Sequence, residues 1–130
     1  MTYYLSLGAN LGNREDTIEQ ALSLLNCSQR SSFYYSSPVE YESTREFCNC
    51  CAMVQSDLSP MDFLHFTQSI ERQLGRTRKS ENGQHFDREI DIDILFTKPE
   101  MRMETEELTL PHKKMEERTF VKVPLKELFS

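Results

Sequence analysis

The sequence lacks long hydrophobic runs: its apolar stretches extend over only a few residues in a chain of 130. None is long enough to cross a bilayer, which takes about 20 apolar residues in a helix. The N-terminus also lacks the basic region, apolar stretch and cleavage site that are typical of a secretory signal peptide. We therefore expect a protein that stays in the cytoplasm.

Glycine is scarce as well, with four residues in the whole chain. None of them belongs to a Walker-type phosphate loop, which excludes a P-loop kinase. The turn from Gly8 to Gly12 is too short and too common in proteins to indicate a nucleotide-binding loop.

Positive charge is in deficit, since the formal net charge is −6 at pH 7. This balance argues against general binding of nucleic acids. The exception is the segment 72–88, where five basic residues face two acidic ones and give a local charge of +3. Such a compact basic segment suits a small polyanion such as a nucleotide, and the alternative is a solvated charged loop.

The four cysteines lack the spacing of a zinc site. Three of them crowd into Cys48-Asn49-Cys50-Cys51, and there is no second, distant pair of ligands. On a strand, Cys48 and Cys50 would point to one face and Cys51 to the other. We predict buried free thiols that act as small hydrophobic side chains, with a metal or redox role as the alternative.

Alternating and helical patterns divide the chain into short elements. Asn13 is suited to cap a helix whose apolar residues recur at helical spacing, and Ser59-Pro60 begins a second helix that Gly75 ends. Strands are expected at 3–7, 31–35, 47–54 and 88–96, and helices at 14–25 and 60–74. Shorter apolar segments follow at 108–112 and 120–124, with a helical turn near 125–129.

The order of these elements, β-α-β-β-α-β with additions, predicts an α+β fold. We expect a ferredoxin-like α/β sandwich with a mostly antiparallel sheet. There is no internal repeat or linker, so we expect one domain over residues 1–130.

The segment Ile90-Asp91-Ile92-Asp93-Ile94 combines a core strand with two carboxylates. Alternation sends the isoleucines into the core and leaves Asp91 and Asp93 on the opposite face, about 7 Å apart. Aspartate is disfavoured in sheets, and two carboxylates on one face repel each other. Mg²⁺ would compensate, because it takes hard oxygen ligands from carboxylates and substrate phosphates. The alternative is a strand with one solvated acidic face.

The neighbouring sequence favours the metal site. Gln68 and Glu71 share one face of the second helix, at a spacing of three residues. This helix leads into the arginine-rich segment, which ends just before the two aspartates. Arginines beside metal-binding carboxylates are typical of phosphoryl transfer, in which both offset charge on the phosphates.

These residues resemble those of the 6-hydroxymethyl-7,8-dihydropterin pyrophosphokinase family. Gly75-Arg76-Thr77-Arg78-Lys79 is similar to the family's G-R-x-R pattern, and the segment from Arg88 to Asp93 is similar to R-x-x-D-x-D. Supporting segments, in the family's order, are 7–12, 31–34, 47–49 and 108–112. The resemblance covers nearly the whole chain.

The resemblance implies an enzyme of folate biosynthesis that transfers pyrophosphate from ATP to the hydroxyl of a dihydropterin, with two Mg²⁺ ions. It implies small-molecule substrates, no nucleic acid or membrane partner, and a monomer. The implied catalytic residues are Arg76, Arg88, Asp91 and Asp93, of which the two aspartates hold the metals. The implied ATP-binding residues are Gln68, Glu71, Arg78, Lys79, His112 and Arg118. The implied pterin-binding residues are Ser36, Val39, Phe47, Asn49 and Phe120.

Two other functions fit parts of the sequence. A non-catalytic ligand-binding or RNA-binding module is one, because ferredoxin-like sheets often serve that way; the net charge and the paired aspartates speak against it. Another is a different Mg-dependent phosphotransferase or a nucleotide hydrolase that uses the same carboxylates. The products separate this last alternative, since pyrophosphoryl transfer releases AMP and simple phosphoryl transfer releases ADP.

Overall fold

An antiparallel sheet forms the centre of the fold in the computed structural model, which describes residues 1–37, 46–75 and 90–129. The strands of the main sheet follow the order β2-β4-β1-β5, and β3 also pairs with β4. The elements are β1 (Thr2–Ala9), α1 (Arg14–Leu25), β2 (Gln29–Arg30), β3 (Tyr34–Ser36), β4 (Phe47–Gln55), α2 (Pro60–Gln73), β5 (Asp91–Lys98), β6 (Met103–Glu104), β7 (Thr109–Leu110) and α3 (Thr119–Leu128). The expected α+β, ferredoxin-like arrangement with a mostly antiparallel sheet is confirmed.

Both expected helices form, and their caps explain where they begin. The Asn13 side chain accepts a hydrogen bond from the backbone N–H of Asp16 at the start of α1. At the start of α2, the Ser59 side chain accepts one from the N–H of Asp62. Each bond satisfies a backbone donor that has no partner within the first turn of a helix.

The strand expected at 31–35 is wrong in its position. Two short strands, β2 and β3, pair with β4 on either side of residues 31–33, so only the end of the expected strand is part of the sheet. Between them the Ser31 hydroxyl accepts the N–H of Cys51, at 2.9 Å, while the Ser31 N–H donates to the Cys51 carbonyl. A side-chain oxygen therefore takes the place of one carbonyl of the ladder, and regular pairing stops there.

The end of the chain also differs from the expectation, since 119–128 forms the helix α3 rather than an extended segment and a final turn. Pro124 lies inside this helix, where it removes one intrahelical hydrogen bond. The buried side chains of Val121 and Pro124 pack α3 against the sheet, which compensates for that bond. The two-stranded sheet of β6 and β7 was not expected from the sequence.

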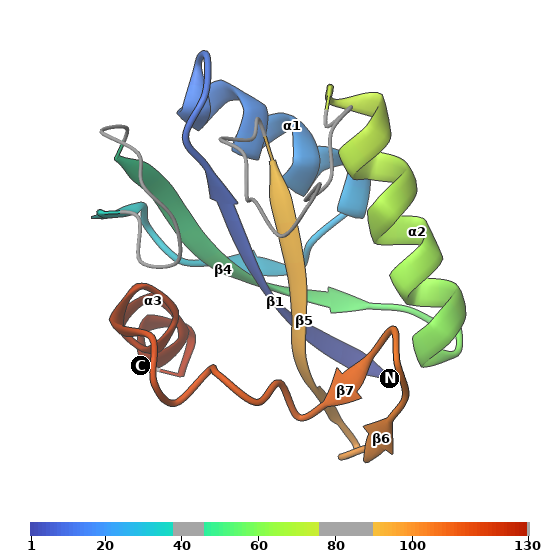
Figure 1. Ribbon diagram of the computed structural model, residues 1–130. Helices are drawn as coiled ribbons and strands as arrows, with labels where there is room; N and C mark the ends of the chain where they lie inside the picture. Colours follow the sequence, from blue (N-terminus) through green and yellow to red (C-terminus); the bar gives the residue numbers. More distant parts are fainter. Residues whose placement is uncertain (38–45, 76–89, 130) are drawn as a thin grey trace.

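The sheet has two covered faces (Figure 1). Helices α1 and α2 cover one face, and α3 lies against the other. The larger core contains Ile90, Ile92 and Ile94, which confirms the expected orientation of the isoleucines. A register shift between β1 and β5 pairs Tyr4 with Phe96 and Leu5 with Ile94, so that Leu95 is an extra residue. This bulge brings Leu95 and Phe96 together in the smaller core beneath α3.

The face beneath α3 also carries Asn49, Asp91 and Asp93, three of the residues expected in the site. Paired residues in neighbouring strands share a face of the sheet. Gly8 pairs with Asn49 on one side and with Asp91 on the other. In the same way, Ser6 lies between Cys51 and Asp93. No helix in the described ranges 1–37, 46–75 and 90–129 meets the length and hydropathy that a membrane span requires.

Candidate active site

The two aspartates of β5 lie on the face of the sheet that carries Gly8 and Ser6, and both are half-buried. Their neighbours on β1 are small, so no bulky side chain of that strand fills the space above the carboxylates. Across the ranges that the structure describes, no group of three or more His, Cys, Asp and Glu side chains could hold a metal ion. The donor set available here is therefore a pair of carboxylates, which fits a cation such as Mg²⁺ that completes its shell with water and phosphate oxygens.

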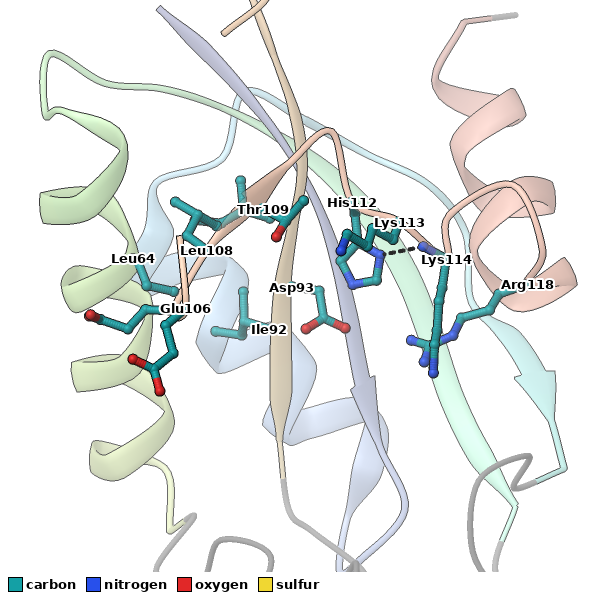
Figure 2. Close-up of a pocket in the computed structure, with 12 residues that line it drawn as sticks. Leu64, Ile92, Asp93, Glu106, Leu108, Thr109, His112, Lys113, Lys114 and Arg118 are labelled. Atoms are coloured by element: carbon teal, nitrogen blue, oxygen red, sulfur yellow. Dashed lines mark hydrogen bonds between the residues drawn. The ribbon is translucent and has the colours of Figure 1, made fainter. Parts of the chain in front are cut away.

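A hollow of about 370 Å³ opens beside Asp93 (Figure 2). We call it the first hollow. Leu64 of α2 and Leu108 give it an apolar wall, while His112 and Arg118 provide polar groups on the side toward α3. Glu106 and Glu107 also line it, so besides Asp93 the hollow carries two further carboxylates. An apolar wall beside cationic groups and carboxylates suits a nucleoside whose phosphates bind together with a metal cation.

The imidazole of His112 has a defined orientation. Its Nδ1 accepts the backbone N–H of Lys114 at 3.1 Å, which leaves the proton of the neutral ring on Nε2. The backbone N–H of His112 donates to the carbonyl of Leu95 at 2.7 Å. This bond fixes the segment after β7 to β5, two residues beyond Asp93.

A second hollow, of about 570 Å³, lies between β3 and the start of α3. Ser36 and Tyr34 line it from β3, and Phe120 lines it from α3. Arg118 belongs to both hollows, and its guanidinium lies over the Phe120 ring at 5.6 Å from the centroid. The second hollow therefore combines an aromatic ring with hydroxyl groups, which suits a flat polar heterocycle.

Asn49 is buried next to the second hollow. Its Nδ2 donates to the Tyr34 carbonyl at 2.9 Å and to Ser36 Oγ at 2.8 Å. A Cβ atom added at Gly8 would lie 3.1 Å from Asn49 Oδ1 and 3.6 Å from the Phe47 ring. Because Gly8 has no side chain, the Asn49 amide and the Phe47 ring can pack directly against the backbone of β1 at this position.

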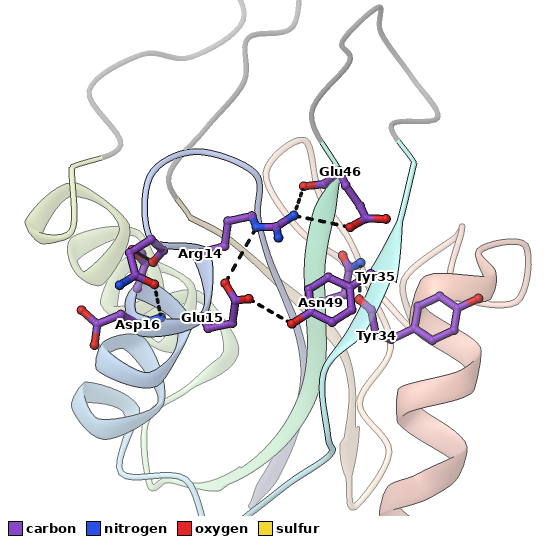
Figure 3. A network of polar contacts seen from close by, with 9 residues as sticks. Arg14, Glu15, Asp16, Tyr34, Tyr35, Glu46 and Asn49 are labelled. Carbon is purple, nitrogen blue, oxygen red and sulfur yellow. Dashed lines mark hydrogen bonds and ion pairs between the residues drawn. The ribbon is translucent and has the colours of Figure 1, made fainter.

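A polar network holds β3 and β4 against the start of α1 (Figure 3). The Tyr35 hydroxyl donates to Glu15 at 3.0 Å, and Arg14 donates to the carbonyl of Glu46 at 2.7 Å. The Arg14 guanidinium also lies 5.3 Å from the centroid of the Tyr35 ring. The hydrogen bond to Glu15 raises the pKa of Tyr35 to about 12, so the hydroxyl remains a donor at neutral pH. These contacts fix the strand ends that carry Ser36 and Phe47.

Gln68 and Glu71 lie on α2, and neither is among the described residues that line the two hollows. Glu71 is buried, and its carboxylate accepts the N–H of Ile92 at 2.7 Å. Ile92 stands between the two aspartates on β5, which is an edge strand of the sheet that the described residues form, so its outward-facing N–H groups have no partner strand there. Glu71 therefore fixes the backbone between Asp91 and Asp93.

We expect Glu71→Ala to lower the free energy of unfolding by about 1–3 kcal/mol, because it leaves the Ile92 N–H buried without this acceptor. Glu71→Gln keeps an acceptor oxygen and should cost less than the alanine variant. Urea denaturation of the two variants measures the difference. Equal stability of Glu71→Ala and the unchanged protein would contradict a structural role for this carboxylate.

The prediction of buried free thiols is confirmed for three of the four cysteines, and Cys27 differs in being half-buried. All four are free, and Cys48, Cys50 and Cys51 are buried. Cys48 and Cys50 belong to the larger core and Cys51 to the smaller one, so they point to opposite faces. Burial raises the pKa of Cys48 to about 11 and that of Cys51 to about 12, and it also raises the pKa of Cys50. These thiols are therefore protonated and unreactive at neutral pH.

We expect a disulfide-exchange reagent to modify the native protein quickly at one thiol, that of the half-buried Cys27. Burial raises the pKa of Cys27 as well, so the difference lies in access: the reagent can reach the half-buried Cys27, whereas the three buried thiols should react only after denaturation. Counting the released chromophore before and after denaturation tests this. Cys27→Ser should remove the fast phase, and rapid labelling of that variant would show that the core thiols are accessible.

The structure thus brings together part of the expected site. Asp93, His112 and Arg118 line the first hollow, and Ser36, Arg118 and Phe120 line the second. Phe47, Asn49 and Asp91 lie on the same face of the sheet. The expected site residues Val39, Arg76, Arg78, Lys79 and Arg88 lie outside the described residues.

Three features of the site were not expected from the sequence. Gly8 makes room for Asn49, Tyr34 lines the second hollow, and Lys114 lines both hollows. Lys114 lies four residues before Arg118, and this spacing of two cations was the one available signal. Gly8 and Tyr34 lie in the segments 7–12 and 31–34 that support the resemblance, but the roles of these two residues depend on which strands pair.

An antiparallel sheet with paired carboxylates, beside two hollows that share Lys114 and Arg118, has the layout of a phosphotransferase with room for two substrates. Residues 4–130 match the sequence model of the 7,8-dihydro-6-hydroxymethylpterin-pyrophosphokinase family. The chain therefore belongs to this family, whose members transfer pyrophosphate to hydroxymethyldihydropterin in folate biosynthesis.

Similar proteins include three that are named 2-amino-4-hydroxy-6-hydroxymethyldihydropteridine pyrophosphokinase. The protein of Porphyromonas gingivalis is 44% identical over 96% of this chain and 88% of its own length. That of Bacillus subtilis is 40% identical over 96% of this chain and 76% of its own length. That of Haemophilus influenzae is 35% identical over 100% of this chain and 82% of its own length.

Proposed function

We propose that this protein transfers pyrophosphate from ATP to the hydroxyl of 6-hydroxymethyl-7,8-dihydropterin, a step of folate biosynthesis. One observation carries the proposal. The hollow lined by Asp93 and His112 adjoins the hollow lined by Ser36 and Phe120, and Arg118 belongs to both. A nucleotide in the first and a pterin in the second would meet beside this arginine.

Mg²⁺ is the cation that we propose for Asp91 and Asp93, with two ions as the family resemblance implies. The carboxylates face the same side of β5, and substrate phosphates would supply further oxygen ligands. When bound, the ions would offset negative charge on the phosphates of ATP. The residues of this chain would hold and orient the two substrates around them.

The reaction that we propose is an in-line displacement at the β-phosphorus of ATP. The hydroxyl oxygen of the pterin forms a bond to that phosphorus, and the bond from the phosphorus to the oxygen bridging toward the α-phosphate breaks. AMP leaves with the bridging oxygen, and the hydroxyl proton passes to solvent. A primary alcohol needs positioning against an electrophile more than it needs a strong base.

The remaining roles follow the resemblance. We propose that the Asn49 amide reads the edge of the pterin while Phe47 and Phe120 enclose its ring, with backbone contacts from Ser36 and Val39. We propose that Arg76 and Arg88 contact the phosphates of ATP during the transfer. ATP would also contact Arg78, Lys79, His112 and Arg118. For Gln68 and Glu71, which line neither hollow, an ATP contact rests on the resemblance alone. The monomeric state, the cytoplasmic location and the single domain over 1–130 stay predictions.

The release of AMP from ATP tests the proposal. The protein is incubated with ATP and Mg²⁺, with and without 6-hydroxymethyl-7,8-dihydropterin, and the nucleotides are separated. AMP that forms only when pterin and Mg²⁺ are both present supports the proposed reaction. Formation of ADP instead would favour a phosphotransferase or hydrolase, and no turnover by folded protein would favour a binding module.

A further inference from the structure

The two hollows share a second cationic residue besides Arg118, and this residue is Lys114. It lines the first hollow together with Asp93 and His112, and the second together with Ser36 and Phe120. Among the described lining residues, Lys114 and Arg118 are the two that both hollows share. The junction between the hollows is therefore bordered by two positive charges.

If the protein has the function proposed above, the group that is transferred must lie at this junction. The β-phosphorus is bonded to AMP before the transfer and to the pterin oxygen afterwards. It must therefore lie within reach of both bound substrates, which is where the two hollows adjoin. The transferred pyrophosphoryl group is strongly anionic, and a cation placed there offsets the charge that develops as the bond to AMP breaks.

The backbone that carries Lys114 is well anchored. Its N–H donates to His112 Nδ1 at 3.1 Å, and its carbonyl accepts the N–H of Glu117 at 3.1 Å. His112 is in turn bonded to Leu95 of β5. The point from which the side chain leaves is thus fixed relative to Asp93, two residues before Leu95.

The side chain itself is exposed and extends from this anchored turn (Figure 2). Lys114 and Arg118 border the same two hollows. An ammonium group on a flexible stem acts as a compact charge that can follow a phosphate, whereas the planar guanidinium of Arg118 binds in a fixed geometry. The two cations are therefore suited to different oxygens of the same group.

We propose that Lys114 binds the pyrophosphoryl group during its transfer and the diphosphate of the pterin product. Lys113, the next residue along the chain, lines the first hollow without lining the second, and its ammonium lies 3.9 Å from Glu104. The position at the junction therefore distinguishes Lys114 from its neighbour.

The test compares three variants in the full chain. Lys114→Met removes the charge and keeps the aliphatic stem, and Lys114→Arg restores a cation. The control is Lys122→Met, which removes the same charge from an exposed position on α3 that lines neither hollow. We expect Lys114→Met to lower kcat for AMP formation by about tenfold to a hundredfold, as loss of a charge-assisted hydrogen bond would. Lys114→Arg should recover most of this loss.

A second readout is independent of turnover. Calorimetric titration with the pterin diphosphate product should give a dissociation constant at least about tenfold higher for Lys114→Met than for Lys122→Met, with equal unfolding midpoints. Equal kcat and equal product affinity in the two methionine variants would overturn the role of Lys114 alone. Failure of the unchanged protein to form AMP and to bind the product would overturn the proposed function together with this inference.

Discussion

Asp93→Asn is expected to lower the rate of AMP formation by at least about a hundredfold, because it removes a carboxylate that we propose holds the metal. Metal stabilisation of phosphoryl charge contributes several kcal/mol, and each 1.36 kcal/mol corresponds to about tenfold in rate. Asparagine has nearly the same shape as aspartate, so the substituted side chain should still fit next to Ser6 and still line the first hollow. Steady-state AMP formation at saturating ATP and pterin, over a series of Mg²⁺ concentrations, measures the effect.

The control for this variant is Asp57→Asn, which removes the same charge from an exposed position in the connection between β4 and α2. It should retain the activity of the unchanged protein. Asp93→Asn should keep the native circular dichroism spectrum, because the substitution leaves the ladder between β1 and β5 intact. Normal turnover by folded Asp93→Asn would rule out the proposed metal site.

Asn49→Ala has the second large expected effect, on use of the pterin. The site would lose the amide that we propose reads the pterin edge, and a buried polar contact of this kind discriminates strongly between ligands. We expect kcat/KM for the pterin to fall by about tenfold to a hundredfold, while the KM for ATP changes little. Initial rates with each substrate varied in turn separate the two parameters.

Stability must be separated from binding in this case. Asn49→Ala also leaves the Tyr34 carbonyl and Ser36 Oγ without their shared donor, at a cost of roughly 1–3 kcal/mol of folding free energy. Ser59→Ala is a suitable control, because it removes the cap of α2, at a cost of about 1 kcal/mol, from a position that does not line the pterin hollow. If Ser59→Ala lowers kcat/KM for the pterin as much as Asn49→Ala does, the effect comes from stability and not from recognition.

The elements that could be predicted from the sequence are those with strong local patterns. The caps at Asn13 and Ser59 placed both long helices, since a cap acts on backbone groups within one turn. Alternation of Ile and Asp in 90–94 predicted which side chains of β5 are buried. The same period predicted that Cys51 faces away from Cys48 and Cys50.

Elements whose local pattern was weak or conflicting were predicted poorly. Proline disfavours a helix interior, yet 119–128 is helical with Pro124 inside it, and burial of Val121 in the smaller core stabilises α3. Ser31 has a side chain that replaces one ladder carbonyl, and nothing in its immediate sequence indicated this. In both places tertiary packing outweighs the preference of the isolated segment.

By itself, the sequence determined the two long helices, the buried side of β5, the common face of Asp91 and Asp93, and the likeness to one family. Tertiary structure alone decided that Asn49 bonds to Ser36, that Glu71 holds the backbone at Ile92, and that Lys114 shares two hollows with Arg118. The physical reason is the range of the interactions. Periodicity and capping act over a few residues, whereas these contacts depend on strand register and on how helices pack across the sheet.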